Sequence, residues 1–279
     1  MNPVSPKRPI GWIAPGLRPA GNEEEAALAK DETLSYLSGD FRIFQRRNGN
    51  RWSMDELVTA FVAVREISRR RSTPAQILDL GTGTASVLMM LLWKYEGAQG
   101  LGVEAQERSA DLARRSIAFN GLDARASIVA SDFRDWSEES KHARPTFELI
   151  TGTPPYFPSG TGLESSKPQC APARFEHRGG VETYAEVAMQ HLDPNGLFVM
   201  CSAANEDVRI ENMPTPAMHH RSKVSVIPKR GKPPLISVHL FSPQPLLSEN
   251  TTLTVRDERD QWTDEFQIAR ETFGLPPRS

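Results

Sequence analysis

The feature that most constrains the fold is a repeated order of strand, turn and helix that begins near residue 74. Strands are expected at 76–80, 100–103, 126–129, 147–150 and 197–201, and helices at 86–93, 108–119 and 184–191. Short apolar strands that alternate with helices form a parallel sheet with helices on both faces. The sequence therefore predicts an α/β fold, whose ligands bind where the carboxyl ends of the strands meet.

The two ends of the chain follow other patterns. Runs at 222–227 and 235–241 around a turn at 229–232 predict a β-hairpin, with a strand at 252–255 and a helix at 263–273 after it. Near the start, prolines at positions 3, 6, 9, 15 and 19 prevent regular structure. The acidic run 23–25 opens a short helix expected to reach about residue 37. We therefore divide the chain into a proline-rich extension, 1–40, and a domain, 41–279.

Composition excludes several classes of protein. With 38% hydrophobic and 24% charged residues among 279, the chain can bury a normal core. Its net charge of −2 creates no global attraction for nucleic acid, so a nucleic-acid site must be a local basic patch. Cys170 and Cys201 are too few for a disulfide framework or a zinc site. No metal is expected, and with no apolar run that spans a bilayer we expect a soluble cytoplasmic protein, or else a nuclear one.

A glycine-containing loop is the first sign of a cofactor. In the segment 79–85, Asp79 precedes Gly81 and Gly83 where a strand turns into a helix, so the backbone can approach a ligand closely. The strict dinucleotide-binding fingerprint, Gly-x-Gly-x-x-Gly, is not matched from Gly81 onward, because Ser86 occupies the position of its third glycine. Glu104 ends the next strand, where a carboxylate can accept both hydroxyls of a ribose, in NAD and in S-adenosylmethionine alike.

Two more signals follow the next two strands. Asp132 and Phe133 come after the third, although Asp132 also suits a helix cap. The run 153–157, Thr-Pro-Pro-Tyr-Phe, follows the fourth. Its prolines stiffen the loop, and its carbonyls and the Thr153 hydroxyl can accept hydrogen bonds from a planar group that carries an NH₂. The same run also suits an ordinary proline turn with a buried tyrosine.

Together these motifs resemble a known family. The run 79–85 is similar to the class I methyltransferase motif, and 153–156 resembles the (Asn/Asp/Ser)-Pro-Pro-Tyr motif of amino-group methyltransferases. The entry segment 45–55 and the segments 166–169, 173–174 and 240–244 are similar to the bacterial tRNA adenine-N6-methyltransferases that modify position 37 of a valine tRNA. The similarity covers about residues 41 to 273, with Thr153 where the family has asparagine. It implies a Rossmann-like, seven-stranded, mostly parallel sheet with a C-terminal antiparallel hairpin.

The resemblance also implies roles for individual residues. Thr153 and the carbonyl of Pro154, stiffened by Pro155, would hold the adenine amino group, and Tyr156 would stack on the base. S-adenosylmethionine, the implied cofactor, would contact a larger set: Arg51, Asp55, Asp79, Gly81, Gly83, Glu104, Asp132, Phe133 and Thr153. Asp55 equally suits the dipole of the helix that begins after Ser53. Independently of the resemblance, the local basic residues Arg46, Arg47, Lys229 and Arg230 lie beside the predicted cleft and would contact the RNA, with tRNA expected, although such charges also suit a solvated face.

Two alternatives remain open at this point. A glutamine side-chain amide offers the same planar NH₂, so the chain could methylate protein glutamine; such enzymes usually carry a helical domain before the core, for which 1–40 is too short. A non-catalytic RNA-binding homologue is the second alternative, because Thr153 departs from the family's asparagine. The sequence leaves the oligomeric state open.

Overall fold

The computed structural model describes residues 9–49, 51–154, 180–245 and 249–277. The strands of its main sheet are β3 (Gln76–Leu80), β4 (Gln99–Glu104), β5 (Ala126–Ala130), β6 (Phe147–Gly152), β7 (Leu192–Ala203), β8 (His219–Ile227), β9 (Ile236–Ser242) and β10 (Thr251–Thr254). Within the described residues this sheet has eight strands, in the order β10-β8-β9-β7-β6-β3-β4-β5.

The strand directions confirm the expected α/β architecture. Strands β5, β4, β3, β6 and β7 are parallel neighbours, and β9 runs antiparallel to β7 on one side and to β8 on the other. The pair β8 and β9 is the expected C-terminal hairpin. Strand β10 adds in parallel to the outer side of β8 and makes the sheet one strand wider than the seven expected.

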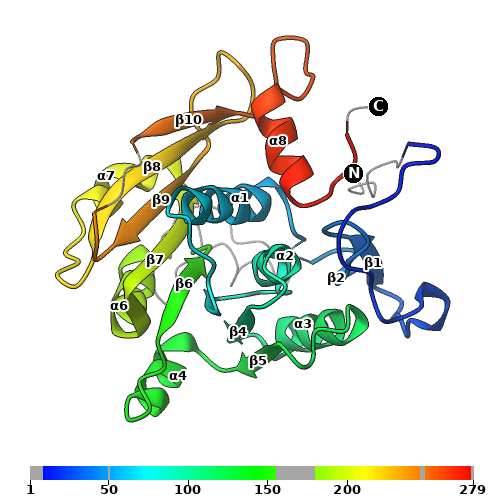
Figure 1. Ribbon diagram of the computed structural model, residues 1–279, viewed down its shortest axis with the longest axis horizontal. Coiled ribbons are helices and arrows are strands. Elements are labelled where there is room, and N and C mark those ends of the chain that lie inside the picture. Colours follow the sequence, from blue (N-terminus) through cyan, green and yellow to red (C-terminus); the bar gives the residue numbers. More distant parts are fainter. Residues whose placement is uncertain (1–8, 50, 155–179, 246–248, 278–279) are drawn as a thin grey trace.

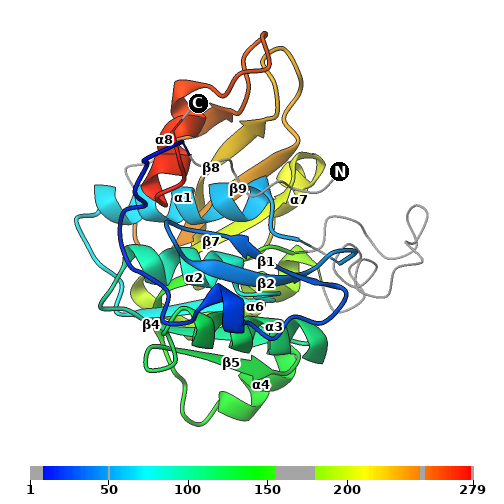
Figure 2. The same ribbon diagram turned by 90° about the vertical axis from the view of Figure 1, so that its right-hand side faces the viewer.

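Helices cover both faces of the sheet (Figures 1 and 2). One face carries α1 (Met54–Arg69), α2 (Ser86–Lys94), α3 (Glu107–Phe119) and α8 (Asp264–Thr272), and the other carries α4 (Phe133–Ser140), α6 (Val181–His191) and α7 (Asp207–Glu211). Successive side chains of a strand point to opposite faces. In β3, Ile77 accordingly packs into the core under α1 and α2, whereas Leu78 and Leu80 pack into the core under α4 and α6.

The N-terminal region differs from its prediction. The expected helix from 23 to about 37 is wrong: the 3-10 helix η1 (Glu23–Glu25) is followed by strand β1 (Glu32–Tyr36), which pairs antiparallel with β2 (Arg42–Arg46). Pairing with a neighbouring strand outweighs the local helix signal, because half-buried side chains gain more from a sheet than from an isolated helical turn. The division at residue 40 therefore falls inside a hairpin.

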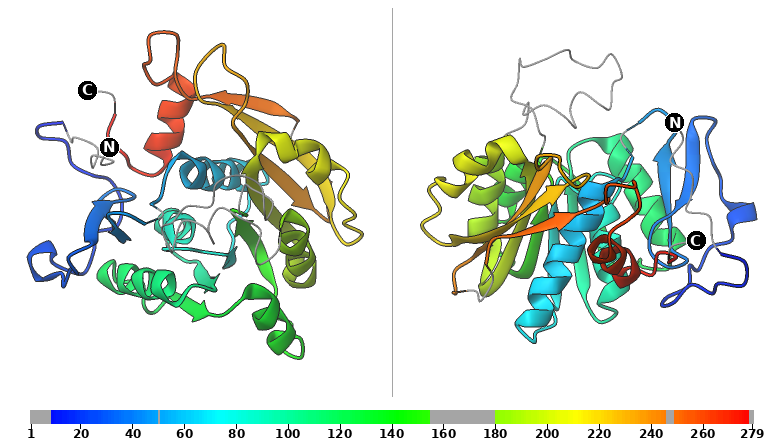
Figure 3. Two further views of the ribbon diagram at one scale, coloured as in Figure 1. Left: turned by 180° about the vertical axis from the view of Figure 1, so that it is seen from behind. Right: turned by 90° about the horizontal axis from the view of Figure 1, so that it is seen from above.

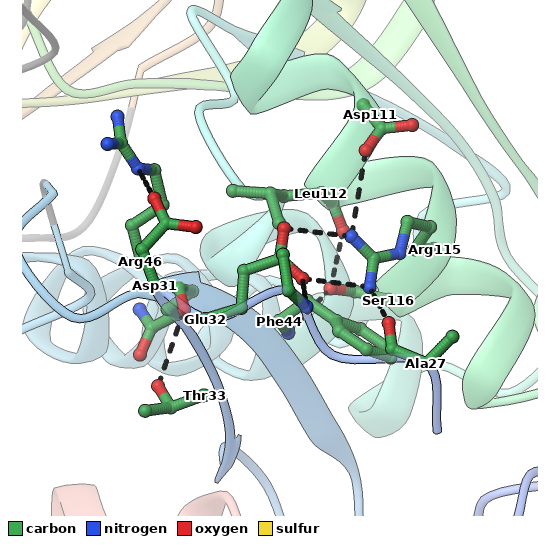
Figure 4. Close-up of polar contacts among 12 residues, drawn as sticks. Ala27, Asp31, Glu32, Thr33, Phe44, Arg46, Asp111, Leu112, Arg115 and Ser116 are labelled. Atoms are coloured by element: carbon green, nitrogen blue, oxygen red, sulfur yellow. Dashed lines mark hydrogen bonds and ion pairs between the residues drawn. The ribbon is translucent and has the colours of Figure 1, made fainter. Parts of the chain in front are cut away.

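This hairpin is attached to α3 by buried polar contacts (Figure 4). The carboxylate of Glu32, only 3% exposed, accepts a hydrogen bond from Arg115 at 3.0 Å. The backbone N–H of Phe44 donates to the hydroxyl of Ser116 at 3.0 Å, and Asn120 bonds both the N–H and the carbonyl of Arg42. The hairpin is thus packed on the domain and forms part of the wall beside the carboxyl edge of the sheet.

Among the described residues, no helix combines the length and the apolar character needed to cross a membrane.

Candidate active site

The four strand ends singled out in the sequence meet at one edge of the sheet. Strand β3 lies between β4 and β6, and β5 lies beside β4, all in parallel. In register, Asp79 is opposite Thr151 and Leu80 is opposite Gly152, so the loops that begin at Gly81 and Thr153 are neighbours. The predicted gathering of candidate residues at the carboxyl edge is therefore confirmed for the ends of these strands.

The loop between β3 and α2 requires its glycines. Gly81 and Gly83 have φ angles of 63° and 58°, in the left-handed region that favours glycine. A Cβ on Gly81 would lie 2.4 Å from the hydroxyl oxygen of Tyr184, whereas one on Gly83 would meet no atom of the described residues within 4 Å. The loop therefore packs closely on one side and leaves room for a ligand beside Gly83.

Glu104 is held in one orientation at the end of β4. Its Oε2 accepts a hydrogen bond from the backbone N–H of Gly83 at 2.8 Å, and its Oε1 accepts one from the N–H of Gln106 at 2.7 Å. The side chain is 6% exposed. This carboxylate thus links the glycine loop to the end of the neighbouring strand.

Asp79 is buried beneath the same loop. Its two carboxylate oxygens accept hydrogen bonds from the hydroxyls of Thr82 and Thr151, both at 2.6 Å. Burial raises the pKa of Asp79 to about 6, although both hydroxyls act in the opposite direction. Thr151 was not singled out from the sequence, because only the register of β6 on β3 brings it to Asp79.

The structure places Asp132 at the N-cap of α4. It accepts a hydrogen bond from the backbone N–H of Arg134 at 3.0 Å and forms two more with that guanidinium, at 2.9 and 2.8 Å. The helix-cap role considered for Asp132 is therefore present. Phe133 is buried against Tyr184, with ring centroids 4.6 Å apart, next to the candidate loop.

Tyr184 is a residue of this site that the sequence analysis missed. It lies in the first turn of α6, and its ring packs against the backbone of Gly81 and Gly152. Burial raises the pKa of its phenol, and the nearby charges of Glu104, Asp79 and Asp132 raise it further. The charge of Asp132 is paired with Arg134, so Glu104 and Asp79 provide the negative charge beside the phenol, and such a site suits a ligand that carries positive charge.

Part of the candidate acceptor loop lies in the described residues. Thr153 follows β6 directly and is half-buried, and Pro154 is buried. Pro155 and Tyr156, together with the family-like segments 166–169 and 173–174, lie outside the described residues.

The candidate residues of the entry segment contact two different elements, the N-terminal hairpin and α1. The guanidinium of Arg51 donates to the hydroxyls of Thr33 and Ser35, at 2.8 and 2.9 Å, and so joins the hairpin. Asp55 accepts a hydrogen bond from the hydroxyl of Ser53 in the first turn of α1. Glu56 accepts the N–H of Ser53 at 2.7 Å, as the capping box predicts.

The basic residues expected to contact RNA form surface ion pairs. Arg46 pairs with Asp31 at 2.6 Å, Lys229 with Asp260 at 3.6 Å and Arg230 with Glu258 at 3.4 Å, while Arg47 is exposed. Exposed pairs of this kind contribute little to stability, so the cations can exchange partners at low cost. In the described part of the chain, no three His, Cys, Asp or Glu side chains are grouped so as to hold a metal ion.

Comparison with curated proteins finds relatives among tRNA methyltransferases. The chain is 27% identical over 250 residues to the tRNA1(Val) (adenine(37)-N6)-methyltransferase of Tolumonas auensis, covering 86% of this chain and 97% of the relative. It is 26% identical over 212 residues to the protein of the same name from Glaesserella parasuis, covering 75% and 86%. No family model matches the chain.

Solved structures agree on the fold. A protein from Agrobacterium tumefaciens, described as a predicted O-methyltransferase, superposes with a TM-score of 0.57 at 17% identity and covers 81% of this chain and 100% of its own. A SAM-dependent methyltransferase from the same organism gives a TM-score of 0.53 at 14% identity, covering 79% and 72%. The resemblance drawn from the motifs is thus confirmed: on the fold of the SAM-dependent methyltransferases, this chain is similar in sequence to the tRNA1(Val) (adenine(37)-N6)-methyltransferases.

Proposed function

We propose that the protein transfers a methyl group from S-adenosylmethionine to the exocyclic N6 of an adenine in RNA, with tRNA as the substrate class, in the cytoplasm. The observation that carries the proposal is the position of Thr153 and Pro154 beside the loop of Gly81, at an edge that also carries Asp79 and Glu104. An acceptor loop and a cofactor loop on adjacent strands bring the two reactants together. The names of the curated relatives support the substrate class.

The residues present fit this cofactor. S-adenosylmethionine carries a sulfonium and an ammonium group, and the carboxylates around Tyr184 provide complementary charge. Gly81 and Gly83 are proposed to contact its methionine part, Glu104 its ribose, and Asp132 and Phe133 its adenine. Arg51 and Asp55 are proposed to approach the methionine end, and Asp79 to support the loop from below. When bound, the cofactor supplies an electrophilic methyl group.

The acceptor loop would orient the amine. An amino group conjugated to a ring is a poor nucleophile, because its lone pair is delocalised into the ring. The Thr153 hydroxyl and the Pro154 carbonyl would accept hydrogen bonds from its two hydrogens, and Tyr156 would stack on the base. These contacts direct the nitrogen lone pair toward the methyl group, so that positioning and electrostatics account for most of the rate.

Cofactor affinity is expected to fall as the pH drops below about 6. The pKa of Asp79 is raised to about 6, so its carboxylate is charged at pH 7.5 and mostly protonated at pH 5. Protonation removes a negative charge from a site that binds a cation, whereas cofactor binding favours the charged form. Calorimetric titration with S-adenosylhomocysteine, which keeps the ammonium group, checks this between pH 5 and 8. Asp79→Asn should flatten the profile; an equally steep profile in that variant would assign the effect to another group.

RNA binding is expected to be local and salt-dependent. Arg46, Lys229 and Arg230 would contact phosphates in place of their present carboxylate partners, and the exposed Arg47 would contact phosphates as well, so affinity should fall steeply as salt increases. The double change Lys229→Gln and Arg230→Gln should weaken RNA binding and leave cofactor affinity unchanged, as fluorescence anisotropy and calorimetry would measure. A matched control is Arg69→Gln with Arg71→Gln, at the far end of α1. If both double variants lose RNA affinity equally, the turn between β8 and β9 is not part of the RNA interface.

The function itself is tested in cells. Nucleosides from the tRNA of cells that lack the protein should lose an N6-methyladenosine that is present in the parent strain, as mass spectrometry detects. An unchanged nucleoside profile would favour the glutamine or non-catalytic alternative.

A further inference from the structure

A second candidate site lies at the same edge of the sheet, between the N-terminal hairpin, the start of α1 and α8. There a cavity of about 560 Å³ is lined by residues of all three elements and of the loops beside them, among them Gln45, Arg51, Trp52, Trp262 and Arg270. Small-molecule sites typically measure roughly 300–1,000 Å³. Seen from above in Figure 3, the hairpin (blue) and α8 (red) lie near one another at one end of the molecule.

Within the described part of the chain, three hydrogen-bond donors around this cavity are buried and have no acceptor. They are the Nε2 of Gln45, the Nε of Arg51 and the Nε of Arg270, and they come from β2, from the segment before α1 and from α8. Gln45 is 1% and Arg270 is 7% exposed. Buried polar atoms are nearly always paired, because an unpaired one loses its bonds to water without compensation. Three unpaired donors around one cavity indicate a ligand that supplies acceptors.

The two guanidinium groups are held in place by their other atoms. Arg51 is bonded to Thr33 and Ser35, as described above. Arg270 donates from Nη2 to the carbonyl of Pro276 at 3.1 Å, and its Cζ lies 3.6 Å from the centre of the Trp262 ring. Both side chains are thus oriented before a ligand arrives, which reduces the entropy lost on binding.

The charge of the cavity favours an anion. Arg51, Arg256 and Arg270 line it, and no aspartate or glutamate is found among its lining residues in the described part of the chain. Burial, with a further contribution from Arg256, lowers the pKa of Arg270 to about 10. Arg256 is paired with Asp260, whose carboxylate lies 3.8 Å away and outside the lining, so the positive charge of the wall comes mainly from Arg51 and Arg270.

Flat apolar surfaces complete the wall. The lining includes four aromatic residues, Tyr36, Trp52, Trp262 and Phe266. Arg42 covers one face of the Tyr36 ring, and Arg270 covers one face of the Trp262 ring. Aromatic side chains and arginine planes are the groups on which unstacked bases of single-stranded RNA are held. Donors for an anion beside surfaces for a flat ring match a nucleotide, whose phosphate and base have these two chemistries.

We propose that this cavity binds one nucleotide of the RNA substrate, distinct from the adenosine that is methylated, with its phosphate near Gln45 and Arg270 and its base against the rings. The cavity is positioned for this role: Arg51 donates to the carbonyl of Arg46 at 3.2 Å, and Pro228 in its wall directly precedes Lys229. It thus lies between the two basic segments proposed to contact RNA. This inference rests on the proposed function.

The test is calorimetry on the full chain, saturated with S-adenosylhomocysteine, with uridine monophosphate as the probe. Uracil has no exocyclic amino group, so this nucleotide is no methyl acceptor. It should bind the wild type, and both Gln45→Met and Arg270→Met should weaken binding at least about 10-fold, since each removes a donor to a charged group. Arg259→Met removes an equal charge from the exposed loop before α8 and should have no effect.

Several results would overturn the proposal. Equal affinity in wild type and both donor variants would place the nucleotide elsewhere. If inorganic phosphate binds as tightly as the nucleotide, the base contributes nothing to binding and the site does not recognise a nucleotide. Competition between uridine monophosphate and S-adenosylhomocysteine would make the cavity an extension of the cofactor site. If Arg270→Met does not fold, Gln45→Met, which keeps the size of the side chain, decides alone.

The source of the nucleotide is tested with a labelled RNA hairpin by anisotropy. Gln45→Met should weaken RNA binding as well; if only uridine monophosphate is affected, the site takes a free nucleotide and the RNA proposal is overturned. Neither titration requires methyl transfer. If the protein methylates RNA but does not bind uridine monophosphate in this cavity, the cavity proposal alone is rejected. If it binds the nucleotide but methylates no RNA, the proposed function alone is rejected.

Discussion

Replacing Thr153 by valine is expected to lower the rate of methyl transfer to RNA by about 100-fold or more, with cofactor affinity unchanged. Valine keeps the shape of threonine and removes the hydroxyl that would accept a hydrogen bond from the target amine. Because that bond strengthens as the lone pair turns toward the methyl group, its loss should appear in kcat. Single-turnover transfer of a labelled methyl group, measured beside calorimetry of the cofactor, separates the two steps.

The matched control is Thr146→Val, at the opposite end of β6, where the side chain is exposed. Thr153→Asn restores the family's acceptor and should retain or raise the rate. For the stacking partner, Tyr156→Ala should lose more activity than Tyr156→Phe, because stacking needs the ring and not the hydroxyl. A normal rate in Thr153→Val would show that the hydroxyl does not contact the reacting amine.

Replacing Glu104 by alanine is expected to weaken S-adenosylmethionine binding by about 10- to 100-fold, which corresponds to the loss of a charge-assisted, two-point contact with the ribose. The structure adds a second reason for a large effect. The same carboxylate accepts the N–H groups of Gly83 and Gln106, so its removal also loosens the glycine loop. Calorimetry measures the affinity, and NAD should not bind to either protein.

Two further variants separate these causes. Glu104→Gln keeps an oxygen for one N–H but loses the charge, so its affinity should lie between those of wild type and Glu104→Ala. Glu107→Ala removes an exposed carboxylate three residues away and should bind normally. Unchanged affinity in Glu104→Ala would refute the assignment of this residue to the cofactor.

The sequence predicted the part of the site that depends on local order along the chain. Gly81, Glu104, Asp132 and Thr153 each follow a strand, and parallel strands carry whatever follows them to the same edge. Neighbouring positions could therefore be inferred without knowing any distance. The antiparallel hairpin β8–β9 was equally accessible, because its turn and flanking runs are local signals.

What the sequence could not predict depends on contacts between distant segments. Tyr184 reaches Gly81 only because α6 packs against β6, the strand next to β3, and nothing near it in the chain marks it as a site residue. Strand β1 was mistaken for a helix because its partner β2 and the buried Glu32 to Arg115 contact are specified by tertiary structure. The acidic partners of Lys229 and Arg230 come from the loop between β10 and α8, about 30 residues later in the chain.

The most direct test of the central claim is methyl transfer in vitro. Purified protein, labelled S-adenosylmethionine and an unmodified tRNA pool are incubated, and the RNA is digested to nucleosides. We predict label in N6-methyladenosine, retained in Thr153→Asn and strongly reduced in Thr153→Val. If wild type and Thr153→Asn both leave RNA unlabelled while they still bind the cofactor, or if the label appears instead on a glutamine amide of added protein, the RNA adenine-N6 assignment is contradicted.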